Sequence, residues 1–397
     1  MAEAAHRAHP RRFILLYALA WAGGTIAYTP FLSILLPVRV AYLAGPGADV
    51  TWLAYLAFSG AIAASLGNVL FGYLSDLTRL RRGWIMLGLA LSGLLLVFSG
   101  RAQTLPELIA VLAAWQLALN MMLAPLAAWA GDRVPDTHKG LLGGLLAFAP
   151  GLGALSGVLV AMPGLADPAT RLVLVALLVA LCVIPLLVFD PASSVPASAA
   201  VPSPAPASRR GVLARMWLAR LAVQIAEATM FAYLYFWLRT LDTAMDDSAT
   251  ARVFSAVLIM SAPTALLAGR WIDQTGRPLA PLVLCAALSA CGLLTMAAAG
   301  TLVIAIAGYA VFGIASGVFL ALHSAQTLRV LPRPERRGRD LGLFNLTNTV
   351  PSLVMPWLTL LIVPMFGYPG LFVLLAGLAS GAAVLLAATR QAHQLHA

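Results

Sequence analysis

The sequence is dominated by long apolar segments, separated by charged residues, prolines and glycines. A helix needs about 20 apolar residues to cross the hydrocarbon core of a bilayer. Twelve segments of roughly that length can be delimited, at approximately 13–36, 51–75, 84–100, 106–130, 140–161, 170–188, 213–238, 251–271, 279–299, 302–328, 341–365 and 368–389. In lipid, a single segment can satisfy all of its own backbone hydrogen bonds only as a helix. The chain is therefore predicted to be an all-α integral membrane protein with twelve transmembrane helices.

Composition excludes a soluble protein. Of the 397 residues 61% are hydrophobic and only 10% are charged, against about 25% charged in soluble domains. The net charge of +10 comes from short basic clusters between apolar segments, a pattern of membrane topology and not of nucleic-acid binding. The three cysteines lack the paired spacing of a metal or redox site. We therefore predict the lipid bilayer as a partner, no metal, no cofactor and no nucleic acid, and we expect a monomer.

A linker divides the chain. Residues 190–211 are rich in proline, alanine and serine and end in two arginines, a composition typical of flexible or polyproline-like connections. Six of the apolar segments precede this linker and six follow it. The predicted domains are therefore a six-helix bundle at 1–189 and a second six-helix bundle at 212–397.

The basic residues indicate the orientation of the chain. In a twelve-helix arrangement one side of the membrane receives most of them, namely Arg7, Arg11, Arg12, Arg79, Arg81, Arg82, Arg133, Lys139, Arg209, Arg210, Arg270, Arg277, Arg329, Arg333, Arg336, Arg337 and Arg339. By the positive-inside rule this side is the cytoplasm, so both termini are predicted to be cytoplasmic. A bacterial-type inner membrane is the predicted location.

The two halves repeat a motif in which an aspartate follows a glycine by four residues and basic residues come next. The first copy comprises Gly72, Asp76, Arg79, Arg81 and Arg82, and the second comprises Gly269, Asp273, Gly276 and Arg277. Gly140 and Gly338 also occupy matching places, each shortly after an Arg-Val pair and a proline. These repeats predict two parallel six-helix units.

This motif and its repetition, together with the twelve segments and the central linker, resemble the major facilitator superfamily over essentially the whole chain. Two departures stand in the first copy, where Leu77 replaces a usual basic residue and Arg79 stands where glycine is common. Residues 336–351 are similar to the sugar-cation symporter and sucrose-transporter side of that superfamily. Those symporters commonly carry an acid in helix one or two, and this sequence has none there.

The resemblance implies roles for the motif and for four helices. Asp76 is expected near residues 336–339 at the start of the eleventh segment, and Asp273 near the fifth, where the loops hold the cytoplasmic side shut. The first, fourth, seventh and tenth segments are expected to line the central cavity. Their polar and aromatic residues are the predicted substrate-cavity residues, namely Tyr17, Trp21, Thr25, Tyr28, Gln116, Asn120, Gln224, Tyr235 and Gln326.

Glu227 is the only acidic residue deep inside an apolar segment. Such a residue costs about 2.5–3.5 kcal/mol at the centre of a bilayer, so it is normally retained for a function or for a partner. Arg220 and Gln224 share its helical face, and Arg220 lies about 10 Å away along the axis. Burial favours a protonated carboxyl group, whereas a nearby arginine favours the charged one. Glu227, Arg220 and His323 are the predicted proton-coupling residues, and a structural ion pair is the alternative.

The predicted function is secondary active transport of a small organic solute by alternating access, coupled to protons. Efflux of a drug or metabolite by proton antiport is the alternative within this class. A membrane-embedded enzyme using Glu227 and His323 as acid and base, or a sensor without transport, are alternatives of other classes. The repeat argues against an enzyme, because duplication serves alternating access and has no evident use in one catalytic site.

Overall fold

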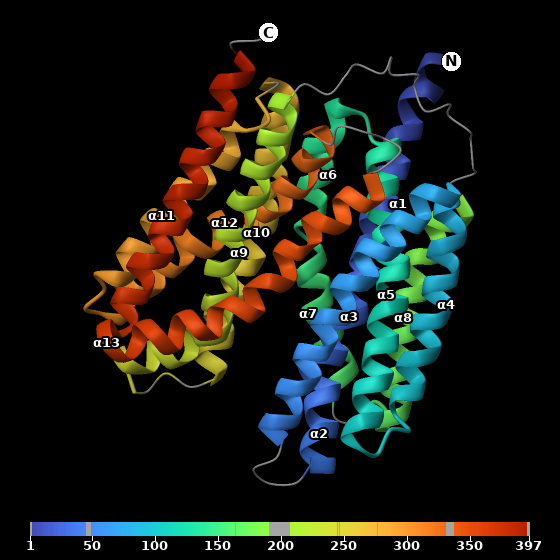
Figure 1. Ribbon diagram of the computed structural model, residues 1–397, viewed down its shortest axis with the longest axis horizontal. Coiled ribbons are helices and arrows are strands. Elements are labelled where there is room, and N and C mark those ends of the chain that lie inside the picture. The colour runs from blue at the N-terminus through green and yellow to red at the C-terminus, as the bar shows by residue number, and fades with distance from the viewer. Residues whose placement is uncertain are drawn as a thin grey trace. The chain divides into compact units, whose positions relative to one another are not determined.

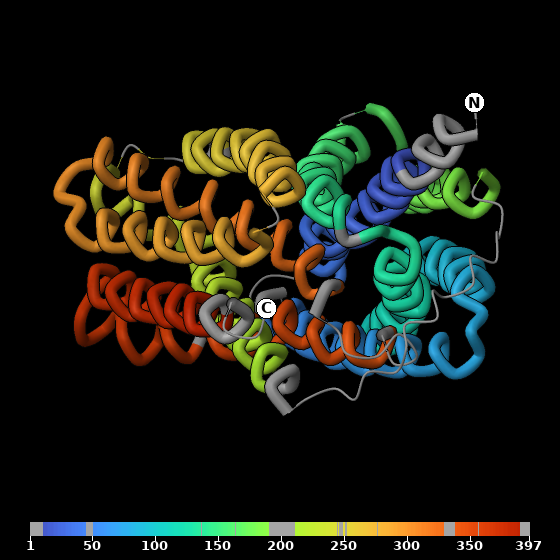
Figure 2. Tube along the Cα trace, turned by 90° about the horizontal axis from the view of Figure 1, so that it is seen from above, coloured from blue at the N-terminus to red at the C-terminus, as the bar shows by residue number. Residues whose placement is uncertain are grey.

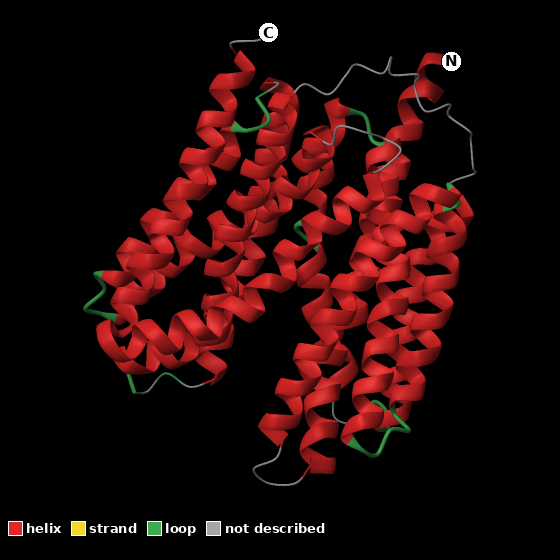
Figure 3. Cartoon of the chain, viewed as in Figure 1, coloured by secondary structure: helices red, strands yellow, loops and turns green. Residues whose placement is uncertain are grey.

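The computed structural model describes residues 2–44, 49–162, 164–189, 207–243, 245, 247–275, 277–330 and 337–394. Regular secondary structure within these ranges is helical throughout, which confirms the all-α class (Figure 3). The elements, labelled in Figure 1, are α1 (Ala2–Pro30), η1 (Phe31–Leu35), α2 (Leu36–Ala44), α3 (Asp49–Thr78), α4 (Arg81–Ser99), α5 (Leu105–Arg133), η2 (Asp136–His138), α6 (Lys139–Leu146), α7 (Ala149–Ala161), α8 (Pro168–Phe189), α9 (Ala207–Leu241), α10 (Asp247–Thr275), α11 (Ala280–Ala297), α12 (Leu302–Val330) and α13 (Arg337–Gln394).

Eleven helical stretches among the described residues are long and apolar enough to cross a membrane. The difference from the predicted twelve lies in α13, which is two helices joined at a kink. Gly367 lies at this junction with φ 65° and ψ −173°, between the two predicted segments that end at 365 and begin at 368. Figure 1 shows α13 turning back on itself. The fold is therefore that of a multi-pass membrane protein.

Prolines interrupt the first and fifth predicted segments. In the first, Pro30 and Pro37 flank the π-helical turn η1, in which the Leu36 N–H bonds to the Phe31 carbonyl. In the fifth, α6 ends at Leu146 and α7 begins at Ala149, so the single helix predicted over 140–161 is broken. Pro150 has no N–H to donate to the carbonyl four residues earlier, which explains why the helix does not continue through this point.

The helices group into two compact units by their contacts. Unit 1 comprises Met1–Pro135, Phe148–Ser203 and Arg333–Leu346, and unit 2 comprises Asp136–Ala147, Pro204–Pro332 and Thr347–Ala397. Each unit thus includes a short segment from the other half of the sequence. The predicted linker lies largely outside the described residues, and the predicted domain boundaries stay a prediction.

Small residues bring the helices of unit 1 together. A Cβ on Gly88 of α4 would collide with the Met122 backbone of α5, and one on Gly23 of α1 would press against α8. The Phe31 ring meets the Trp115 ring of α5 edge to face, with centroids 4.9 Å apart. Close backbone approach gives the dispersion contacts that hold helices together where lipid supplies no hydrophobic driving force.

Unit 2 has an aromatic and aliphatic core. The Trp237 ring of α9 meets the Phe372 ring of α13 edge to face, with centroids 4.6 Å apart, and Phe312 of α12 is fully buried beside them. Gly292 of α11 faces the Phe312 backbone so closely that a Cβ would collide with it. Consistent with this contact, α11 and α12 lie side by side (Figure 2).

Replacing Gly367 by alanine is expected to destabilise the protein. Its φ of 65° with ψ −173° belongs to a region that essentially only glycine occupies. Forcing a Cβ into such a conformation costs about 1–3 kcal/mol, so the melting temperature of the detergent-purified Gly367→Ala protein should fall. Gly381→Ala is the matched control, because Gly381 is helical and a Cβ there meets no atom within 4 Å. Equal melting of the two variants would contradict this assignment.

Candidate transport site and loop clasps

The first copy of the repeated motif forms a clasp within unit 1. The Asp76 carboxylate accepts backbone N–H bonds from Gly338 and Arg339 at the start of α13, both at 2.9 Å. A Cβ on Gly72 would collide with the Gly338 carbonyl, so the motif glycine is required by this approach. A carboxylate at a helix N-terminus satisfies donors that have no intrahelical partner. We call these contacts the unit 1 clasp.

The arginines of the first motif copy differ in their contacts with this clasp. The Arg81 guanidinium pairs with Asp76 at 2.6 Å, donates to the Ser75 hydroxyl at 2.6 Å and reaches Asp132 at 3.2 Å. Arg79 is exposed, and its φ of 55° explains why glycine suits this position. Arg82 is half-buried. Of the predicted basic residues, Arg81 is the one that the structure places in contact with the aspartate.

The second copy forms the equivalent clasp within unit 2. The Asp273 carboxylate accepts N–H bonds from Gly140 at 2.9 Å and from Leu141 at 2.8 Å, both at the start of α6. A Cβ on Gly269 would collide with the Gly140 carbonyl. Arg277 is exposed, and Gly276 lies outside the described residues. The two motif copies therefore make the same pair of backbone bonds with matching partners.

Lys139 adds a contact to the unit 2 clasp that sequence reasoning missed. Its side chain is buried and its ammonium donates to the Leu328 carbonyl at 3.1 Å, near the C-terminal end of α12. A cation at a helix C-terminus is favourable because the last carbonyls have no intrahelical donor. The sequence indicated Lys139 only as a topology signal.

Glu227 lies in α9 with a buried oxygen. Its Oε2 atom has no hydrogen-bond partner, and neither has Oε1 of Gln224, one turn earlier on the same helix. Ser316 of α12 lies near the carboxylate, and its hydroxyl donates to the Gly313 carbonyl at 3.3 Å. The side-chain oxygen and nitrogen of Gln326, also in α12, are likewise buried without partners. Unsatisfied buried polar atoms are rare in proteins and mark sites for water, ions or ligands.

Arg220 shares the Glu227 face but is bound elsewhere. No ion pair within 4.0 Å joins these two described side chains. The Arg220 guanidinium donates, at distances between 3.0 and 3.3 Å, to the Ser324 and Thr347 hydroxyls, the Asn348 side-chain oxygen and the Leu320 carbonyl. Its donors therefore tie α9 to α12 and α13, and Glu227 is left without a direct cationic partner at contact distance.

His323 of α12 is completely buried and both ring nitrogens have partners. Nε2 lies 3.1 Å from the Met216 carbonyl, and Nδ1 lies 3.2 Å from the Thr327 hydroxyl. A carbonyl oxygen only accepts, so Nε2 must carry the proton. This arrangement suits a neutral imidazole that packs α12 against α9.

The predicted cavity residues of the first segment are spread over different environments. Tyr17 is buried and stacks on Trp21, with centroids 6.2 Å apart. The Thr25 hydroxyl lies 2.8 Å from the Ala149 carbonyl of α7, so it joins two helices of unit 1. Tyr28 is 40% exposed. Within unit 1 these residues form an aromatic and hydroxyl stripe, and their cavity role stays a prediction.

The Asn120 side-chain amide of α5 has a partner that sequence reasoning missed. Asn68 of α3 donates to the Asn120 side-chain oxygen at 2.9 Å, and Asn120 donates to the Gln116 backbone carbonyl at 2.8 Å. All three side chains are buried. Asn68 is the only amide side chain in its apolar segment, a signal that was available. The pair holds α3 against α5.

Tyr235 of α9 lines a pocket and accepts a hydrogen bond from Arg239 at 2.7 Å. The Arg239 guanidinium also lies over the Tyr235 ring, 5.5 Å from its centroid. The sequence analysis named Tyr235 and missed Arg239, because an arginine at the end of an apolar segment is usually only a boundary signal.

Neutralising either clasp aspartate is expected to destabilise the protein. An asparagine at position 76 or 273 retains one acceptor, loses the charge and places an NH2 group against a backbone donor. Hydrogen bonds to charged groups contribute about 1.5–3 kcal/mol, so Asp76→Asn and Asp273→Asn should each lower the melting temperature of the purified protein. Asp132→Asn is the control, since Asp132 reaches Arg81 at 3.2 Å from a side chain that is 31% exposed. The clasp assignment fails if the control melts as early as both variants.

Comparison with known proteins agrees with this architecture. The sequence profile of the Major Facilitator Superfamily matches residues 216–396. No curated protein matches the sequence significantly. Among solved structures, the human organic anion transporter TETRAN superposes with a TM-score of 0.74 at 15% identity, covering 95% of this chain and 99% of that one.

Two sugar transporters are similarly close in structure. The proton:xylose symporter XylE has a TM-score of 0.72 at 13% identity and covers 94% of this chain and 95% of that one. The E. coli fucose:proton symporter has a TM-score of 0.73 at 14% identity and covers 95% of this chain and 98% of that one. The second half of the chain therefore matches the sequence profile of the Major Facilitator Superfamily, and nearly its whole length shares the fold of these transporters.

Proposed function

We propose that the protein is a secondary transporter that moves a small organic solute by alternating access and couples this movement to protons through Glu227. The observation that carries the proposal is the buried Glu227 Oε2 atom without a hydrogen-bond partner. It lies beside the buried and unpartnered oxygen of Gln224 on one helical face. An acid in this position has a physical reason to exchange its proton.

The surroundings of Glu227 favour a change of protonation. A charged carboxylate buried without a paired cation is costly, whereas a neutral carboxyl group in the same place is not. Arg220 gives its donors to α12 and α13, so no contact ion pair holds Glu227 in the charged form. Opening the site to water would stabilise the carboxylate and release the proton. Protonation and solvent access are thereby linked.

His323 is the less suitable proton carrier. Its Nε2–H is used by the Met216 carbonyl, and its Nδ1 faces the Thr327 hydroxyl, which also bonds to the His323 carbonyl at 2.9 Å. Adding a proton at Nδ1 would place a cation in a fully buried site. We therefore assign the coupling to Glu227 and propose that His323 and Arg220 position α9 against its neighbours.

We propose that the two clasps act as the gate on the cytoplasmic side. Each consists of one carboxylate and two backbone donors, so its loss costs a few kcal/mol and is comparable to the differences that separate two conformations. The basic residues around the clasps, such as Arg81 and Lys139, support placing this side in the cytoplasm by the positive-inside rule. Both chain ends would then be cytoplasmic, in an inner membrane.

The similar structures support proton coupling more than a particular solute. Two of them are described as proton symporters, for xylose and for fucose, and another is described as an organic anion transporter. Sugars and organic anions differ in charge and in apolar surface. The solute class therefore has to come from the residues of this chain.

Replacing Glu227 by glutamine is expected to abolish proton coupling. In infrared difference spectra of the purified protein, a change of pH should produce the carbonyl stretch of a protonated carboxyl group, and Glu227→Gln should remove this band. In proteoliposomes, wild-type protein should accumulate a solute when a pH gradient is applied, and the variant should only equilibrate it. The solutes tested are xylose, naphthoate and naphthylmethylammonium.

Glu107→Gln is the matched control. Glu107 closes a capping box at the start of α5, and glutamine preserves such a box. The control should retain both the infrared band and gradient-driven accumulation. Unchanged accumulation by Glu227→Gln would refute proton coupling at this residue. Binding without flux for every solute in the wild-type protein would instead indicate a sensor.

A further inference from the structure

We propose that a pocket between α9 and α10 binds an aromatic organic anion, with its ring against Phe231 and Phe254 and its negative group on Arg239. This inference rests on the proposed transport function, because it names the class of solute that the proposed transporter would handle. It concerns a part of α9 separate from Glu227 and can be tested without transport.

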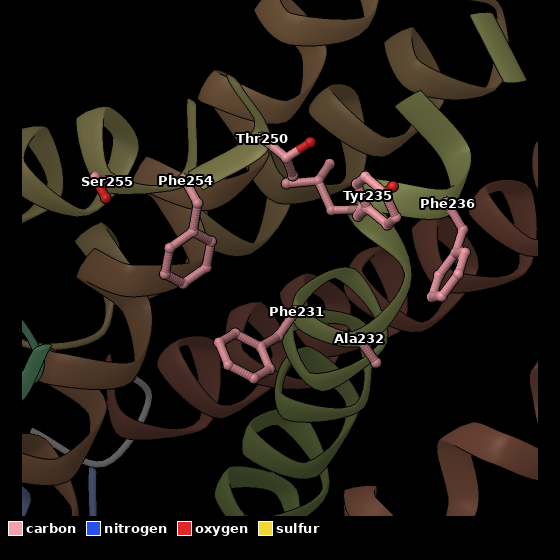
Figure 4. A pocket seen from close by; sticks show the side chains of 8 residues that line it. Phe231, Ala232, Tyr235, Phe236, Thr250, Phe254 and Ser255 are labelled. Atoms are coloured by element: carbon pink, nitrogen blue, oxygen red, sulfur yellow. The ribbon is translucent and has the colours of Figure 1, made fainter. Parts of the chain in front are cut away.

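The pocket is apolar and aromatic with a few hydroxyl groups. Its volume is about 410 Å³, within the range of about 300–1,000 Å³ of pockets for small ligands. The lining residues are Phe231, Ala232, Leu234, Tyr235, Phe236, Thr250, Phe254 and Ser255. Figure 4 shows Phe231 and Phe254 extending toward each other from the two helices. Their rings are 5.5 Å apart at 66°, so an added ring can find both an aromatic face and an edge.

Arg239 supplies a fixed positive charge beside the pocket. One of its nitrogens donates to the Tyr235 hydroxyl at 2.7 Å, and its guanidinium lies over the Tyr235 ring. No carboxylate among the described residues forms an ion pair with Arg239. A guanidinium has five N–H donors in a planar fork suited to a carboxylate, and among the described residues a hydrogen bond engages one of them. Tyr235 thus orients an arginine to which the described part of the chain supplies no contact carboxylate.

The pocket follows Glu227 along α9. Glu227, Phe231, Tyr235 and Arg239 are spaced at intervals of four residues, so each neighbours the next on the helix surface. Each interval advances about 6 Å along the helix axis and turns about 40° around it, so the row winds around α9 toward Arg239. Phe231 is therefore the pocket residue nearest to Glu227 in this row, and Arg239 lies at its far end.

The residue types select among solute classes. A sugar needs several directed hydrogen bonds, but half of the lining residues here are aromatic and two more are aliphatic. An aromatic cation would suit the rings and would be repelled by Arg239. An aromatic carboxylate matches both the rings and the guanidinium, because a charge-assisted pair with arginine is stronger than a neutral hydrogen bond. The combination therefore points to a flat apolar body with one negative group.

Calorimetric titration of the full-length protein in a non-ionic detergent tests this assignment. The probes are naphthoate, the neutral naphthamide and the cationic naphthylmethylammonium. Naphthoate should bind at least about tenfold more tightly than naphthamide, and Arg239→Gln should remove this preference while leaving naphthamide binding within about twofold. Phe254→Ala should weaken both naphthoate and naphthamide. Arg101→Gln is the control, because Arg101 lies over the Phe98 ring in unit 1, 5.9 Å from its centroid.

Equal binding of naphthoate and naphthamide by the wild-type protein would overturn the proposal, as would an Arg239→Gln variant that keeps the preference. An Arg239-dependent retention of phosphatidylglycerol in nanodiscs that naphthoate does not displace would assign the pocket to lipid and also overturn it. The Glu227→Gln variant should still bind naphthoate. If the wild-type protein binds naphthoate as expected but accumulates no solute in a pH gradient, the transport proposal alone is refuted. If it shows proton-driven accumulation but no Arg239-dependent preference for naphthoate, this inference alone is refuted.

Discussion

Every helix of this protein must satisfy its own backbone, because lipid offers no hydrogen bonds, and the irregular points of the fold follow from this constraint. Helix α6 ends at Leu146, because Pro150 has no N–H to donate to the Leu146 carbonyl. Helix α1 continues into the π-helical turn η1, which lies between Pro30 and Pro37. The starts of α6 and α13 expose unpaired N–H groups inside packed units. The Asp273 and Asp76 carboxylates satisfy them.

The glycines of the motif are explained by the same contacts. A carboxylate reaches two consecutive N–H groups only if the two helices approach closely, and Gly72 and Gly269 permit this approach. Both copies of the motif therefore preserve the close approach of two helices as well as the pattern of charges. The surroundings have diverged, since Arg81 pairs with Asp76 whereas Lys139 supports the second clasp through the Leu328 carbonyl. Because the carboxylate bonds of the two clasps are alike but the basic residues beside them differ, we expect the two clasps to open at different free energies.

The helices could be predicted from the sequence because apolar length is a local pattern, and it located the spans. The contact of Asp76 with the start of α13 came from the resemblance to the major facilitator superfamily, because nothing local in the sequence joins positions so far apart. The sequence did not predict which way each helix is rotated against its neighbour. That rotation decides that Asn120 pairs with Asn68 and that Arg220 binds α12 and α13 instead of Glu227. Helical spacing identifies a shared face, but it contains no information about the opposite helix.

The order of side chains along α9 has a consequence for energetics. An acid lies between two arginines, and each arginine has its own partners: Arg220 on α12 and α13, and Arg239 on Tyr235. Neither cation is therefore held by Glu227 at contact distance, so the carboxyl group can change charge without breaking an ion pair. A solute anion at Arg239 would lie about 18 Å from Glu227 along the axis. At that separation the anion and the carboxyl group would influence each other far less than groups in contact do, because the Coulomb energy falls with distance. The two ends of this row of side chains would therefore change their occupancy without exchanging ion-pair partners.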